Sequence, residues 1–165
     1  MSVVPPNLRA EFMRGGWFEG RETSIDASVP QSHPARAVLA ELSGVSLTRP
    51  DEHVIEVDFK FLKSDDSFII AWATALGMRL VGIAEAHNAH GELFMTDLGH
   101  VIGSSVVHEA CWFEGRSFAE AMAAILKGKR SRPMLLPTQA EVTLYGVVFE
   151  HGNAAVITPD SVELR

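Results

Sequence analysis

The chain has 165 residues, of which 47% are hydrophobic and 21% charged, and its formal net charge is −7. This composition is that of one soluble domain with a hydrophobic core, and the acidic balance argues against general nucleic-acid binding, which needs a basic surface. The single cysteine, Cys111, excludes an internal disulfide, and the longest apolar run, residues 68–76, is too short to span a bilayer. Because the first residues also lack a signal-peptide pattern, we expect a cytoplasmic protein with no membrane partner.

The first half of the chain is predicted to form three helices and one strand. The helices are expected over residues 5–14, over about 34–43, and from the acidic start at 64–66 to Gly77. Apolar and polar side chains alternate over residues 54–61, which predicts a strand with one buried and one solvated face. The side chains expected on the solvated face are Glu56, Asp58 and Lys60.

The second half is predicted to be mainly strands around one helix. Strands are expected at 79–86, 92–96, 100–102 and 106–108, and a last hairpin is expected from 142–149 and 154–157 around a turn at 151–153. Ser117 and Glu120 have the spacing of a capping box, which predicts a helix over 118–127. The order of elements indicates an α+β fold with a single, mostly antiparallel sheet and helices packed on it.

The segment from Gly16 to Arg21 combines two glycines, an aromatic pair and an arginine. Glycine permits backbone angles closed to other residues, so Gly16 and Gly20 indicate an ordered turn. We expect Trp17 to be buried and Arg21 to form hydrogen bonds within its own domain. A direct part in partner recognition is the alternative, because Trp and Arg are frequent binding hot spots. The same pentapeptide, Trp-Phe-Glu-Gly-Arg, recurs at 112–116, but the flanking residues do not align, so no structural repeat is predicted.

No set of residues specifies catalysis, a metal or a cofactor. His87 and His90 have only two glutamates near them in the sequence, whereas a metal site needs three or four converging ligands. Asp65 and Asp66 suit a helix start better than an acid pair, and Cys111 lies in an apolar stretch typical of a core. We therefore predict no catalytic residue, no metal and no cofactor.

Four segments resemble, in order and spacing, the third subgroup of the SUKH superfamily of bacterial immunity proteins. These segments are Gly16 to Arg21, the Leu-Gly and following strand at 76–85, the strand, Asp-x-Gly turn and strand at 92–101, and the helix at 115–128. The resemblance covers about residues 5–130, and residues 138–165 have no clear counterpart. It implies a SUKH-like domain over 1–137, with a C-terminal strand or hairpin extension over 138–165 packed on the same domain. It also implies that Gly16, Trp17, Gly20 and Arg21 form a family signature with a structural role.

The resemblance implies a non-enzymatic protein of polymorphic toxin systems. Such a protein binds a cognate toxin domain, of nuclease or deaminase type, and neutralises it in the cytoplasm. A regulatory interaction module of the same superfamily without a toxin partner is one alternative, and a small hydrolase using the histidines and Asp97 is another. If the toxin is basic, we expect it to be drawn to an acidic surface formed by Asp51, Glu52, Glu56 and Asp58.

Overall fold

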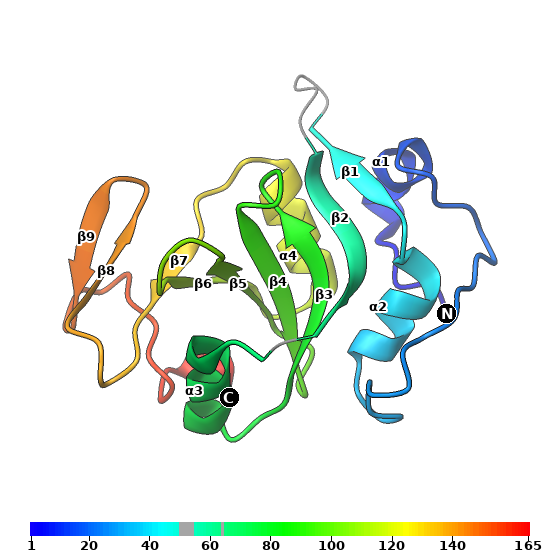
Figure 1. The fold of residues 1–165 in the computed structure, drawn as a ribbon. Helices are drawn as coiled ribbons and strands as arrows, with labels where there is room; N and C mark the ends of the chain where they lie inside the picture. Colours follow the sequence, from blue (N-terminus) through cyan, green and yellow to red (C-terminus); the bar gives the residue numbers. More distant parts are fainter. Residues whose placement is uncertain (50–54, 64) are drawn as a thin grey trace.

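The computed structural model describes residues 1–49, 55–63 and 65–165, and these form an α+β fold (Figure 1). In the described residues, seven strands pair in one antiparallel sheet whose spatial order is the chain order, which confirms the expected fold class. The strands are β1 (Ser46–Thr48), β2 (Ile55–Leu62), β3 (Leu80–Ala86), β4 (Gly91–Thr96), β5 (Val101–Ser105), β6 (Cys111–Gly115) and β7 (Arg132–Met134). The helices are η1 (Pro6–Leu8), α1 (Arg9–Arg14), α2 (Ala35–Leu42), α3 (Ser67–Leu76), α4 (Phe118–Leu126) and η2 (Val162–Leu164).

Helices cover the sheet on both faces. The larger core joins α1, α2 and α4 to one face, and α4 is seen behind the sheet in Figure 1. On the opposite face, α3 packs on β4, β5 and β6. The C-terminal residues Ile157 and Leu164 are buried in this second core, so the end of the chain is packed on the sheet.

Three aromatic rings at the centre of the larger core come from three different elements. Phe12 of α1 and Phe59 of β2 stack with ring centroids 6.0 Å apart. Phe118 of α4 lies 6.3 Å from the first ring and 5.8 Å from the second. Such pairs add to the stabilisation from burial alone, so this cluster links the N-terminal helix, the sheet and α4.

The helix starts follow the local signals in the sequence. The Asp66 carboxylate accepts hydrogen bonds from the backbone N–H of Phe68 at 2.8 Å and of Ile69 at 3.2 Å, which confirms the acidic cap of α3. At α4, the Ser117 hydroxyl accepts from the N–H of Glu120 at 3.2 Å, as a capping box requires.

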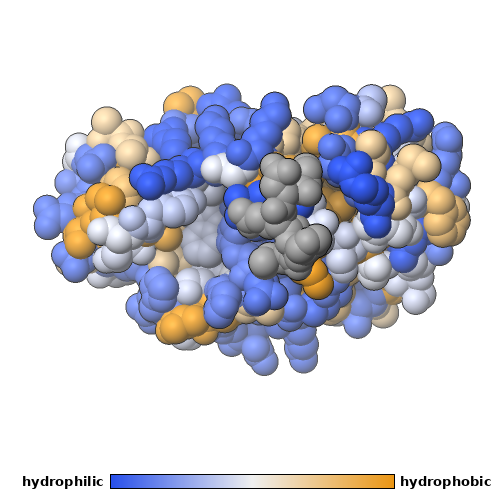
Figure 2. All heavy atoms as spheres, turned by 90° about the horizontal axis from the view of Figure 1, so that it is seen from above, coloured by the Kyte–Doolittle hydropathy of each residue, from blue (hydrophilic) through white to orange (hydrophobic). Residues whose placement is uncertain are grey.

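The C-terminal hairpin lies where a single strand was expected. Residues 142–149 do not form one strand; they turn at Tyr145 and Gly146, whose φ angles are 54° and 73°. The strands on either side are β8 (Glu141–Leu144) and β9 (Val147–Glu150), which form a separate two-stranded sheet within the described residues. Valines on both sides of the turn made the segment resemble one strand. Tyr145, Val147 and Val148 of this hairpin are exposed. Figure 2 shows apolar atoms at this end of the molecule and also at the opposite end.

The prediction of a strand at 106–108 was also wrong. These residues form a connection between β5 and β6, and Val107 is 74% exposed. The strand instead begins at Cys111, where alternate side chains are buried in the core beneath α3. A prediction from apolar residues alone therefore misplaced the strand, because the valines of this connection face solvent.

Candidate functional site

The turn from Gly16 to Arg21 has the structural role that its sequence predicted. Trp17 is 4% exposed, and its indole N–H donates to the Glu41 carboxylate at 2.9 Å. The Arg21 guanidinium donates to the backbone carbonyls of Glu41 at 2.8 Å and of Ser43 at 2.5 Å. These contacts tie the turn to the end of α2 and confirm that Trp17 is buried and that Arg21 bonds within its own domain.

The two copies of the Trp-Phe-Glu-Gly-Arg pentapeptide adopt different structures. In the first, Gly16 just before it and Gly20 within it have φ angles of 98° and 79°, in the region that favours glycine. In the second, residues 112–115 belong to β6. The shared sequence is therefore not a structural repeat.

The structure describes two of the four acidic residues that were expected to form one surface. Asp51 and Glu52 lie outside the described residues. Asp58 lies on the solvated side of β2 with about one third of its side chain exposed, but Glu56 is only 3% exposed. The expectation that Glu56 lies on the open face was therefore wrong.

A β-bulge explains the position of Glu56. On β1, Leu47 pairs with Val57 and its neighbour Thr48 pairs with Ile55, so Glu56 is an extra residue in β2. A bulge interrupts the alternation of side chains and re-aims the inserted residue. Glu56 and Val57 are consequently both buried, and Ile55 is exposed.

Buried Glu56 is bound by two basic side chains. The Nε and Nη2 atoms of Arg49 donate to one carboxylate oxygen at 2.8 and 2.6 Å. The Nδ1 atom of His87 lies 3.2 Å from the other oxygen. This charge is engaged inside the protein, so Glu56 is a poor contact for a partner.

Three partly exposed carboxylates lie side by side across three neighbouring strands of the sheet. Asp58 of β2 is paired with Glu85 of β3, and Glu85 is paired with Glu92 of β4. We call these three residues the acidic row. Like charges directly opposite each other on neighbouring strands are destabilising, so the row costs the sheet stability.

One lysine partly neutralises the acidic row. The Lys60 ammonium lies 2.7 Å from the Glu85 carboxylate and 3.2 Å from that of Asp58, and these contacts raise the lysine pKa. Partial burial, followed by the charges of Glu85 and Asp66, raises the pKa of Glu92. Because the ammonium contacts two of the three carboxylates and adds a single positive charge, the row keeps an excess of negative charge.

A second carboxylate is turned inward by a bulge in β6. Val101 pairs with Gly115 and Ile102 pairs with Phe113, so Glu114 is the extra residue. It is 6% exposed. As at Glu56, the irregular register directs an acidic side chain into the protein.

Glu114 is buried but hydrogen-bonded on both carboxylate oxygens. The Trp112 indole N–H donates to one oxygen at 2.6 Å and the Ser131 hydroxyl donates to the other at 2.8 Å. Burial outweighs these bonds and raises the pKa of the Glu114 carboxyl above its ordinary value. Such a perturbed acid beside a cavity is a marker of functional sites.

Glu114→Gln should change stability in a pH-dependent way. Because the folded-state pKa of Glu114 is raised, ionisation costs stability; the cost appears as pH rises through the unfolded-state pKa and is complete above the folded-state pKa. Glutamine keeps the shape and two polar atoms without the charge. The variant should therefore gain stability relative to the parent when the pH is raised from about 3 to about 7. Urea unfolding of both proteins at the two pH values measures this change. Glu109→Gln, at an exposed site, is the control; an equal shift there would contradict the assignment.

The structure also places the residues that were considered as a nucleophile, as metal ligands or as part of a hydrolase site. Cys111 is buried in the core, and burial raises the pKa of its thiol to about 12, which disfavours the thiolate that a nucleophile needs. Among residues 1–49, 55–63 and 65–165, no three His, Cys, Asp or Glu side chains are grouped so as to hold a metal. Asp97 accepts from the N–H and Nε of Arg79 at 2.7 and 3.0 Å and lies 3.7 Å from Nε2 of buried His33. These contacts link the start of α2 to the sheet.

Comparisons of the chain with protein-family models, with curated proteins and with solved structures returned no match. Within the described part of the chain, no helix has the length and apolar character that crossing a membrane requires. The chemistry of the surface and the resemblance in the sequence are therefore the basis for a functional proposal.

Proposed function

We propose that this protein is an immunity protein of the SUKH type, which binds a basic toxin domain of nuclease or deaminase class and neutralises it in the cytoplasm. It acts by binding and catalyses no reaction. The SUKH-like segments support the class of protein. The observation that supports a binding surface is the acidic row, Asp58, Glu85 and Glu92, in register across β2, β3 and β4.

The acidic row suits a basic partner for two physical reasons. The mutual repulsion of its carboxylates is relieved when cationic side chains bind, so part of the stability lost in the free protein is recovered in the complex. Acidic patches also attract basic partners over several ångströms and raise the association rate, an effect that salt screens. The row lies on paired strands of a sheet, which hold its charges in fixed positions.

Neutralising the row should slow association with the cognate toxin domain. In Asp58→Asn/Glu85→Gln/Glu92→Gln we expect the association rate to fall several-fold at low salt, with a smaller difference at high salt. The control is Glu19→Gln/Glu22→Gln/Glu141→Gln, which changes the net charge equally at exposed sites elsewhere. Surface plasmon resonance at several salt concentrations measures the rates.

The outcomes separate the surface from the function. Toxin binding that is equally affected in both triple variants would reject the acidic row but leave the immunity function. A neighbouring gene without a toxin domain would instead favour a regulatory interaction module without a toxin partner.

A further inference from the structure

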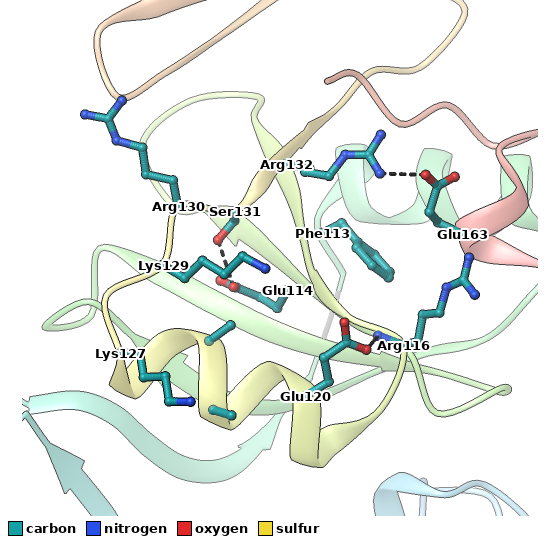
Figure 3. A pocket seen from close by; sticks show the side chains of 12 residues that line it. Phe113, Glu114, Arg116, Glu120, Lys127, Lys129, Arg130, Ser131, Arg132 and Glu163 are labelled. Atoms are coloured by element: carbon teal, nitrogen blue, oxygen red, sulfur yellow. Dashed lines mark hydrogen bonds and ion pairs between the residues drawn. The ribbon is translucent and has the colours of Figure 1, made fainter. Parts of the chain in front are cut away.

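A cleft of about 400 Å³ lies between α4 and the segment 129–132, beside β6 (Figure 3). Its wall includes the Phe113 ring and two alanines of α4, Ala123 and Ala124. A second cavity of about 160 Å³ shares Glu114, Lys129, Arg130 and Ser131 with it. The volume and the apolar wall are those of a small-molecule site rather than of a flat protein interface.

The cleft gathers positive charge in an acidic protein. Five of the 14 Lys and Arg residues line it, against three glutamates, although the chain has a net charge of −7. Arg132 is bound to Glu163 at 2.5 Å, and Arg130 lies over the Tyr145 ring at 5.3 Å and points away from the cleft in Figure 3. The hydrogen bond from Arg132 lowers the pKa of the Glu163 carboxyl, and Arg116, which extends toward Glu163 in Figure 3, contributes to this lowering. Lys127 and Lys129 also line the cleft.

The backbone fixes the elements that carry these cations. Arg116 precedes α4, and its N–H donates to the Glu120 carboxylate at 2.9 Å. After α4, Gly128 has a φ of 64° and the N–H of Lys129 donates to the carbonyl of Ala124 at 2.9 Å, which closes the helix end. Lys127 and Lys129 therefore lie together after the C-terminal end of α4, while Arg116 lies at its opposite end.

The floor of the cleft carries a hydrogen-bond acceptor, the Glu114 carboxyl, in addition to the cations of the rim. The bulge in β6 directs the Glu114 carboxyl to this position, where Ser131 and Trp112 hold it. Each carboxylate oxygen can accept more than one hydrogen bond, so Glu114 retains capacity for an O–H or N–H group of a ligand. The site therefore combines an anion-binding rim, an apolar wall and a polar floor.

We propose that this cleft binds a phosphate-bearing small molecule of nucleotide size. Its phosphates would face Lys127 and Lys129, since ammonium groups bind phosphate oxygens through charge-assisted hydrogen bonds. Its planar organic part would pack on Phe113 and the alanines of α4. This ligand site is separate from the acidic row and does not depend on the proposed immunity function.

Isothermal titration calorimetry of the full chain at low salt with ATP, tripolyphosphate and adenosine tests this proposal. We expect ATP to bind more tightly than tripolyphosphate, and adenosine to show no binding. Lys127→Glu/Lys129→Glu should weaken ATP binding at least tenfold. Arg14→Glu/Lys63→Glu changes the net charge equally at two exposed sites away from the cleft and should retain ATP binding.

Three results would overturn the proposal. No measurable ATP binding by the folded parent protein would reject the site. Equal weakening of ATP binding by both double variants would show attraction to net charge and not to the cleft. Tripolyphosphate binding as tightly as ATP would show a bare polyanion site without the proposed contact to the organic part.

Discussion

Trp17→Ala is expected to lower the free energy of unfolding by about 3–5 kcal/mol, the range for removing a large aromatic from a core. The ring is 4% exposed, and Arg9 covers it with its guanidinium 5.7 Å from the ring centroid. The substitution also leaves the Glu41 carboxylate without its indole donor. Urea unfolding monitored by circular dichroism measures the loss.

Phe18→Ala provides the control for Trp17, because the neighbouring ring is 60% exposed. Its unfolding free energy should stay close to that of the parent. A Trp17→Ala protein with the stability of the parent, but without toxin binding, would contradict the structural role and support the recognition role of this turn.

Phe59→Ala is also expected to lower the free energy of unfolding by about 3–5 kcal/mol. The side chain is 1% exposed and contacts the rings of Phe12 and Phe118, so its removal opens a cavity where α1, α4 and the sheet meet. Denaturant unfolding gives the change in free energy, and near-ultraviolet circular dichroism reports the loss of aromatic packing.

Phe61→Ala is the matched control on the same strand. Phe61 is only partly buried at the edge of the same core, so its removal should cost clearly less than that of Phe59. Equal losses at both positions would contradict the central place of the three-ring cluster.

The sequence predicted elements best where a short local signal determines them. The capping box at Ser117 and the acidic cap at Asp66 each satisfy backbone N–H groups a few residues away, so they need no information about distant contacts. The C-terminal hairpin was misplaced because its turn depends on the positive φ of Tyr145, a residue that rarely marks such turns.

The acidic surface was only partly predictable. The alternation around Asp58 gave its side correctly, but Glu56 is turned inward by pairing with β1, and this pairing has no local pattern in β2. Glu85 and Glu92 were missed as surface partners, although the turn between β3 and β4 could have placed them opposite each other. Assigning strand pairs across each predicted turn would therefore have found most of the row.

The neighbour-to-neighbour order of the sheet has a consequence for how the chain assembles during synthesis. Each strand from β2 to β7 pairs with the strand that precedes it, so closing each loop costs little entropy and the sheet can grow as the chain emerges from the ribosome. The core between α1 and the sheet does not follow this order, because Phe12 and Phe59 are synthesised before Phe118, the third ring of their cluster. Until α4 emerges, the nascent protein exposes this apolar face, and we expect it to depend on chaperones at that stage.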